Sequence, residues 1–316
     1  MTVVFTTTEL GLAFAALAIA FQVEDDSDLL HNGTPPRIHL ALQPHAGKTL
    51  AYMLVEHSEC DSAEQPSTQT TRLDIALRVE SVDKHLIALR CVFTGLKCDN
   101  SEEHFDSVTD DLRHGVPIHS LAALLHRPFT VKMKPNGEVV LIELEDFRSR
   151  LMAGLPGQEW NELTGESLTT WVRNKVTSAL LERYLLAVIP RYPIADTGLG
   201  ARWRITQWSD WTKGIEWELT CLGEPDIRMD MRSTSGLSTS EFIDSLVFFT
   251  RSTLIGSTVT ADGTAVLDRS TGLFKAASLV RRSTATLQYN SETRTVGDEE
   301  MYSLVSVSVP PNIRWD

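Results

Sequence analysis

Apolar and polar residues alternate along much of the chain between residues 30 and 100, which is the pattern of half-buried β-strands. The clearest run is Leu73–Val79, in which every second residue is leucine, isoleucine or valine. Similar alternation over 38–42, 50–54 and 87–93 predicts a meander of antiparallel strands with one apolar and one wet face. Further along, Pro135-Asn136-Gly137 separates two apolar runs and predicts a tight hairpin turn with a positive φ at Gly137.

The apolar period then changes to that of a helix. A short helix is predicted over Glu145–Leu155, and apolar spacing predicts a second, continuous helix of roughly six turns over 168–189. Pro190 and Pro193 follow the second helix and would end it. The residues expected to turn toward the sheet from that helix are Val172, Val176, Ala179 and Leu180.

Strand-like alternation resumes after residue 200. It covers 203–205, 215–221, 227–231, 254–260, 264–267, 273–279, 285–289 and 302–309. Between the last two runs, a carboxylate cluster formed by Glu292, Asp298, Glu299 and Glu300 is expected in a solvated hairpin loop.

The order of elements predicts an α+β fold that is mostly antiparallel β. Two arrangements fit: two meandering β-rich lobes joined by a helix, or one curved sheet packed on a long central helix. The corresponding boundaries are an N-terminal β-rich lobe over 35–145, a helical connector over 146–194 and a C-terminal β-rich lobe over 195–316.

Residues 1–28 form a candidate signal segment. Leu10–Ala20 is an apolar run of eleven residues, which is too short to cross a bilayer but has the length of a signal-peptide core. Ala18-Ile19-Ala20 matches a small-x-small cleavage site, although no lysine or arginine precedes Glu9. The alternative is a buried N-terminal helix. No other stretch approaches spanning length, so we expect no membrane span.

Five short segments follow a shared plan: a glycine-led first strand (Gly47–Tyr52), a second strand (Leu73–Val79), a hairpin (Lys134–Val139), a glycine-x-x-tryptophan segment (Gly200–Trp203) and a late glycine hairpin (Asp268–Leu273). In these segments the chain resembles a family of bacterial envelope proteins with a domain of unknown function. The resemblance covers most of residues 35–310. The resemblance implies two β-rich lobes and an export signal, often of the lipoprotein type. This chain lacks the lipid-accepting cysteine after its apolar run.

Charge and motifs narrow the function. With 29 lysines and arginines against 42 aspartates and glutamates, the formal net charge of −13 disfavours nucleic acid as a partner. Nucleotide-binding, zinc-protease and serine-hydrolase fingerprints are absent from the sequence. We therefore predict no catalytic residue, no cofactor and no metal ligand, and rank an enzyme without a recognisable motif below the other hypotheses.

The histidines and cysteines do not alter that prediction. His104, His114, His119 and His126 are irregularly spaced in an acidic segment, which is typical of a solvated loop rather than a metal site. Four cysteines, Cys60, Cys91, Cys98 and Cys221, would allow two disulfides in an exported protein, whereas the strand position of Cys91 favours a buried thiol.

The leading hypothesis is a non-enzymatic protein, secreted or in the bacterial periplasm or cell envelope, that binds an apolar small molecule between sheet and helix. A cytoplasmic location is the alternative. The competing function is a structural or protein-interaction module with a filled core. The ligand-contact candidates are Trp208 and Trp211, which flank a Ser-Asp turn, and Val172, Val176 and Leu180 on the long helix. Trp203 and Trp217 fall on inward strand positions, which favours core packing for both.

Overall fold

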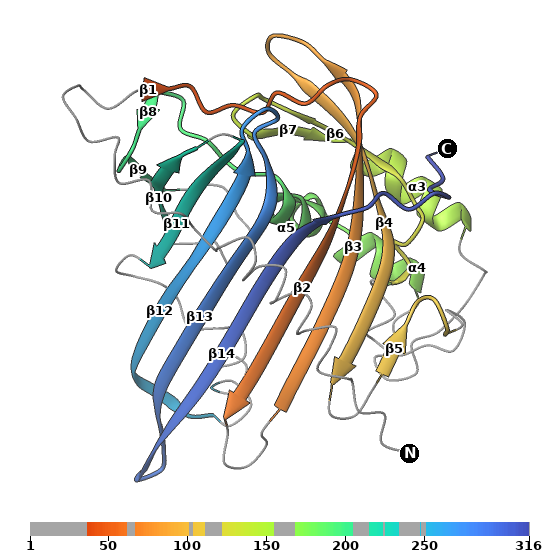
Figure 1. Cartoon of the computed structure of the whole chain (residues 1–316). Coiled ribbons are helices and arrows are strands. Elements are labelled where there is room, and N and C mark those ends of the chain that lie inside the picture. The colour runs from red at the N-terminus through yellow and green to blue at the C-terminus, as the bar shows by residue number, and fades with distance from the viewer. Residues whose placement is uncertain are drawn as a thin grey trace, which may run out of the picture.

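One long, strongly bent antiparallel sheet dominates the computed structural model (Figure 1). The structure describes residues 37–61, 67–100, 104–110, 122–154, 168–204, 215–223, 225–233, 247 and 251–315. Its strands are β1 (Arg37–Ile38), β2 (Thr49–Asp61), β3 (Ser67–Val82), β4 (Ile87–Asn100), β5 (His104–Asp106), β6 (Phe129–Met133), β7 (Val139–Ile142), β8 (Thr197–Gly198), β9 (Arg202–Arg204), β10 (Ile215–Leu222), β11 (Asp226–Ser233), β12 (Thr253–Asp268), β13 (Leu273–Tyr289) and β14 (Glu292–Val307).

The sheet has twelve strands, and its order joins the two ends of the chain. The order is β7-β6-β4-β3-β2-β14-β13-β12-β11-β10-β9, with β5 pairing with β4, while β1 and β8 form a separate two-stranded sheet. The seam is the antiparallel β2–β14 pair, in which Leu54 lies opposite Leu304. Both predicted β-rich segments therefore contribute to one sheet. Whether 35–145, 146–194 and 195–316 are separate folding units stays a prediction.

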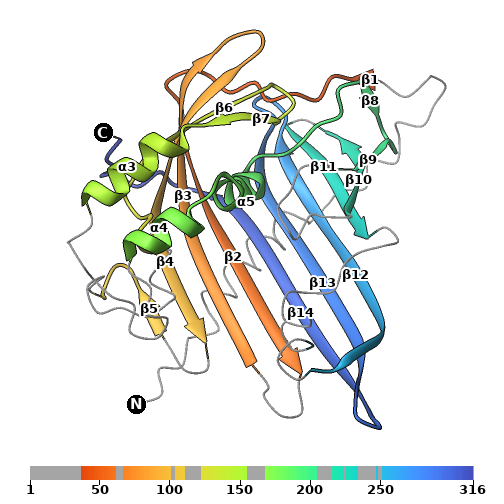
Figure 2. The ribbon, with the colours of Figure 1, turned by 180° about the vertical axis from the view of Figure 1, so that it is seen from behind.

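Three helices lie on one face of the sheet, as the view from behind shows (Figure 2). They are α3 (Leu144–Gly154), α4 (Leu168–Lys175) and α5 (Ser178–Val188). α3 confirms the short helix predicted over Glu145–Leu155. Aromatic rings link two of the helices to the sheet: Phe93 of β4 packs on Tyr184 of α5 at 5.7 Å, and Phe129 of β6 packs on Phe147 of α3 at 5.2 Å.

The long central helix predicted over 168–189 is wrong. The helix breaks between α4 and α5 at Thr177, whose backbone is extended (φ −110°, ψ 165°) and whose side chain accepts a hydrogen bond from the Leu180 N–H. This is the N-cap arrangement, in which a threonine outside the helix satisfies one of its unpaired amide donors. The break changes the inward face: Ala179 is exposed, while Leu181 and Leu185 are buried.

Strands β12, β13 and β14 are longer than the apolar pattern predicted. The runs over 273–279 and 285–289 belong to a single strand, and the carboxylates of 292–300 lie in β14 rather than in a hairpin loop. Polar residues occupy inward positions there, which interrupts the apolar alternation. Arg281, Ser283 and Asp298 are examples, and all three are buried.

The hairpin turn between β6 and β7 is confirmed. Gly137 has φ +84°, and its N–H donates to the Lys134 carbonyl, as a tight turn requires. Among the described residues, no helix combines the length and the hydropathy that a membrane crossing demands.

Candidate ligand-binding site

The candidate site lies where the chain leaves α5 and crosses the sheet. Pro190 ends the helix because it has no N–H to donate and disfavours a helical conformation at Ile189, which is extended (φ −120°, ψ 116°). The crossing segment is fixed at several points. The Tyr192 N–H donates to the Asn136 carbonyl at 3.0 Å, and the Tyr192 hydroxyl donates to the Gly272 carbonyl at 2.5 Å.

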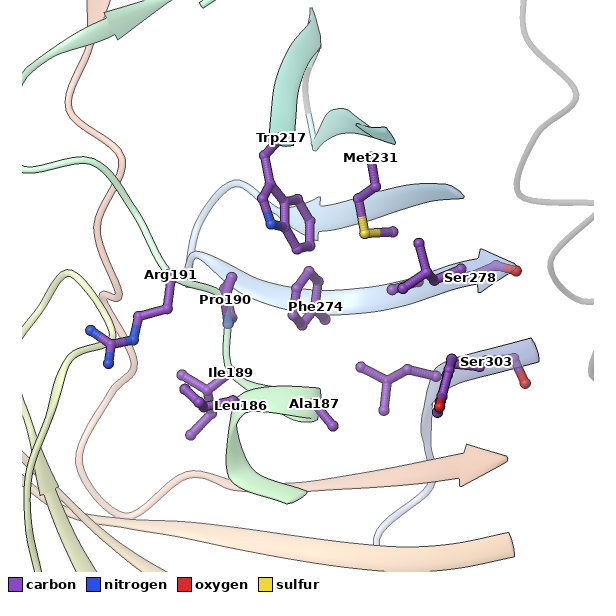
Figure 3. Close-up of a pocket in the computed structure, with 14 residues that line it drawn as sticks. Leu186, Ala187, Ile189, Pro190, Arg191, Trp217, Met231, Phe274, Ser278 and Ser303 are labelled. Carbon is purple, nitrogen blue, oxygen red and sulfur yellow. The ribbon is translucent and has the colours of Figure 1, made fainter. Parts of the chain in front are cut away.

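A cavity opens between this segment and the sheet (Figure 3). The cavity has a volume of about 20 Å³ and opens to solvent. Figure 3 shows α5 and its exit on one side and strands β10, β11 and β13 on the other, and the labelled apolar residues are Leu186, Ala187, Ile189, Trp217, Met231 and Phe274. The cavity is thus a narrow apolar space between a helix end and a sheet.

Trp217 and Phe274 form the sheet side of the cavity. Their rings stack, with centroids 6.0 Å apart and planes inclined by 26°. Both side chains are buried, each with 4% of its surface exposed. Alternation along β10 brings Trp217 to the inner face of the sheet, as the sequence predicts, and Met231 of β11 lies directly opposite it in the strand pairing.

The indole nitrogen of Trp217 is the one polar side-chain atom of this aromatic pair, and among the described residues it is buried without a hydrogen-bond partner. Figure 3 shows the nitrogen on the side of the ring that faces Pro190. Trp203 provides a contrast, because its indole N–H donates to the Arg191 carbonyl at 3.0 Å. Buried tryptophan N–H groups usually have a partner, so Trp217 is chemically unusual.

Arg191 lines the cavity, but its guanidinium extends away from Trp217 and Phe274 (Figure 3). Burial lowers the pKa of Arg191, while the negative charges of Glu138 and Glu182 oppose that shift. Burial also raises the pKa of Glu182, and the nearby Arg191 partly offsets it. The cationic residue of the lining, Arg191, therefore lies close to two acidic side chains, and its charged group is directed away from the aromatic pair.

A row of buried polar side chains continues along the inner face beyond the cavity. Tyr302 lines the cavity, and burial followed by the charge of Glu300 raises the pKa of its hydroxyl. Arg183 of α5 approaches Glu56 of β2 at 3.8 Å, and Arg281 of β13 approaches Glu300 at the same distance. The inner face thus changes from apolar near α5 to charged farther along β13 and β14.

Of the ligand-contact residues predicted from the sequence, the three that the structure describes are not part of the cavity lining, and the other two lie outside the described residues. Val172 and Val176 are completely buried and Leu180 is half-buried; the cavity lining includes none of them. Trp208 and Trp211 lie outside the described residues. Contact of these five with a ligand stays a prediction. Sequence reasoning assigned Trp217 to core packing and missed the cavity, because Phe274 and Pro190 meet it only in the folded chain.

Other candidate chemistry is confined to single residues. In the described part of the chain, no three histidine, cysteine or acidic side chains are grouped as a metal would require. His104 and His126 are exposed, and His114 and His119 lie outside the description. None of the four cysteines, all of which lie within the described residues, forms a disulfide, and complete burial raises the pKa of the Cys91 thiol.

Comparisons with known proteins do not extend this assignment. No family model matches the chain, and no curated protein matches it significantly. Among solved structures, one described as lipid–protein interactions in lipovitellin aligns with this chain with a TM-score of 0.49 and 10% sequence identity. The alignment covers 84% of this chain and 25% of the lipovitellin chain. An outer membrane channel from Pseudomonas putida F1 gives 0.19 at 9% identity, covering 84% and 98%. The chain spans about a quarter of the lipovitellin chain, and both scores lie below 0.5.

Proposed function

We propose that this protein binds an apolar small molecule between the end of α5 and the sheet. The observation that carries the proposal is the cavity itself, which is lined mainly by apolar side chains of a helix end and four strands and is partly open to solvent. Ligand sites in proteins are typically concave and apolar with few polar groups. A native core normally leaves few such spaces, because interiors pack as densely as organic crystals.

Binding would require the cavity to widen. The space that admits the centre of a water-sized sphere is about 20 Å³, which is about the room for one water molecule. Met231 is the side chain best suited to move, because methionine is unbranched and adapts to irregular spaces. Its terminal methyl carbon lies 3.1 Å from the position that a Cβ on Gly263 would occupy. We infer that ligand entry displaces Met231 and the last turn of α5 from the sheet.

Two alanines on α5 provide the test. Ala187 is buried and lines the cavity, whereas Ala179 is exposed. Ala187→Phe should fill the cavity and abolish binding of an uncharged fluorescent apolar probe, while Ala179→Phe should bind the probe as the wild type does. Native mass spectrometry of freshly purified protein should show a co-purified apolar molecule in the wild type and in Ala179→Phe, and none in Ala187→Phe. Equal binding by both variants, or no binding by the wild type, would contradict the proposal.

A second candidate function is association through a sheet edge. β11 pairs with β12 only from Asp262 onward, so Thr253–Ala261 pairs with β13 on one edge and, among the described residues, has no strand on the other. Residues 252–261 carry no charge, and 253–258 are exposed. Long uncharged edges are templates for strand pairing. Pairing with a second copy of this chain would match the uncharged run with itself around a two-fold axis, so that no like charges meet within it.

The oligomeric state decides this second candidate. Thr258→Lys places a charge on the open edge, whereas Thr284→Lys places one on an exposed position of β13 that has β12 on one side and β14 on the other. Analytical ultracentrifugation should show a dimer for the wild type and Thr284→Lys, and a monomer for Thr258→Lys. A monomeric wild type at high protein concentration would rule out self-association through β12.

We also propose export to the cell envelope, in keeping with the envelope-protein resemblance. The support is the apolar run Leu10–Ala20 with its small-x-small site, and this run lies outside the described residues. N-terminal sequencing of protein from its native cell should find a chain that starts after Ala20. A chain that starts at Met1 or Thr2 would contradict export by a cleaved signal.

A further inference from the structure

The unpartnered indole N–H of Trp217 defines what the ligand must offer. An indole can only donate a hydrogen bond, and among the described residues its nitrogen is buried here without an acceptor. Pro190 and Phe274, labelled near it in Figure 3, have hydrocarbon side chains, and the thioether of Met231 is a weak acceptor. The hydroxyls of Ser278 and Ser303 also belong to the lining, but Figure 3 shows them on the side of the cavity away from this nitrogen. A donor in such surroundings is satisfied by an acceptor that comes with the occupant of the cavity.

The position of the nitrogen specifies where that acceptor lies. Figure 3 shows the nitrogen directed to the side of Pro190, at the exit of α5. Proline has no N–H that could compete for the acceptor. Phe274 on the sheet side and Leu186 on α5 are both apolar, and the space between them suits a hydrocarbon chain.

We propose that the ligand is an acyl lipid whose carbonyl oxygen accepts the Trp217 Nε1–H while its chain lies along Phe274 and Leu186. This inference rests on the proposed function. The Arg191 guanidinium extends away from Trp217, so it does not lie where it could balance a carboxylate at the indole nitrogen, and a neutral ester carbonyl is favoured there. The net charge of −13 acts in the same direction, because it repels anions.

Three ligands of equal chain length distinguish the contribution of the carbonyl to the affinity from that of the hydrocarbon chain: dodecane, laurate and methyl laurate. Wild-type protein should bind methyl laurate more tightly than laurate and more tightly than dodecane in a probe-displacement assay. Trp217→Phe keeps an aromatic ring but removes the donor. It should weaken methyl laurate binding about fivefold to tenfold, as expected for one hydrogen bond, and leave dodecane binding unchanged.

Trp203→Phe is the matched control. It removes an indole donor that already has a main-chain partner, the Arg191 carbonyl, and Trp203 is not part of the cavity lining. This control should lower thermal stability without changing the ratio of ester to alkane affinity. In ¹H–¹⁵N spectra, the indole peak that Trp217→Phe removes should move when methyl laurate is added to wild-type protein, and not when dodecane is added.

The outcomes distinguish the two proposals. Equal affinity of wild-type protein for methyl laurate and dodecane, with no movement of the Trp217 indole peak, would overturn the acyl inference and leave the proposed function intact. An equal loss of affinity for methyl laurate and for dodecane in Trp217→Phe would also overturn the acyl inference, since Trp217 would then act only through packing. Binding of none of the three ligands would overturn both.

Discussion

Gly137 connects the hairpin turn of β6–β7 to the chain crossing at the site. A Cβ at this position would lie 2.2 Å from the Pro190 carbonyl oxygen, and the residue also has φ +84°. Gly47 has nearly the same conformation, φ +81°, but open space where its Cβ would be. The two glycines therefore separate backbone strain from steric exclusion.

Alanine at each glycine tests this separation. Gly47→Ala should lower the free energy of unfolding by about 1 kcal/mol, which is the cost of a left-handed conformation for a residue with a Cβ. Gly137→Ala should cost on the order of 3 kcal/mol or more, because the Pro190 segment must also shift. Urea denaturation measures both, and equal losses would show that the crossing segment yields freely.

Asp106 provides a residue-scale dependence on pH. Burial alone would raise the pKa of its carboxyl, but the Val108 N–H and the Lys97 ammonium, 2.9 Å away, outweigh burial and lower it. A lowered folded-state pKa means that the stabilisation is present above the unfolded value of about 3.9 and is lost as pH falls through the folded value.

Asp106→Asn should therefore lower the free energy of unfolding by about 1–3 kcal/mol at neutral pH, with a difference from wild type that shrinks below about pH 4. Denaturant titrations at several pH values measure this difference. Asp83→Asn is the control, because Asp83 also accepts two backbone N–H groups but lies in an exposed turn. A difference for Asp106→Asn that stays constant down to pH 3 would contradict the assignment.

At the scale of elements, the helix break was hidden in the sequence by apolar residues on both sides of it. Val172 and Val176 of the first half are buried as predicted, but the periodicity continues through Thr177 with no glycine or proline to mark an end. Threonine is compatible with both a helix interior and an N-cap, so local pattern alone does not decide between them.

The N-cap can be tested directly. Thr177→Ala removes the acceptor for the Leu180 N–H and should cost about 1 kcal/mol of unfolding free energy. Ser178→Ala, at the exposed first residue of α5, should cost much less. Chemical denaturation of the two variants provides the comparison, and an equal effect would show that Thr177 does not cap α5.

The missed strand residues have a different physical cause. Period-two patterns identify strands whose inner face is apolar, and this works for Leu73–Val79. It fails on β13 and β14, where Arg281 faces the buried side opposite Glu300. Oppositely charged inward residues that pair across strands look like loop composition when each strand is considered alone.

At the scale of the whole molecule, the cavity depends on contacts that no local pattern contains. Trp217 and Phe274 are separated by more than fifty residues, and α5 reaches them from a third part of the chain. The sequence predicted the antiparallel class and the single-sheet alternative, together with a ligand between sheet and helix. The ligand stays a prediction, and the sequence could not locate the cavity, because strand order sets which residues meet.

The same strand order predicts that the two β-rich lobes do not fold independently. β14 lies between β13 and β2, so it completes the sheet of both predicted lobes. A fragment over 195–316 would expose the Leu304 face and the edge of β14 that β2 covers, and a fragment over 35–194 would lose the partner of β2. Exposed long edges favour aggregation over folding.

Neither fragment should therefore unfold cooperatively when it is expressed alone, whereas co-expression of the two should restore a complex with a single thermal transition. Calorimetry and circular dichroism measure these transitions. The Tyr192 hydroxyl bond to Gly272 adds a second link across the cut, so Tyr192→Phe should weaken the reconstituted complex. A cooperative transition from residues 195–316 alone would show instead that the C-terminal lobe is an independent domain, with β2–β14 pairing as a later docking step.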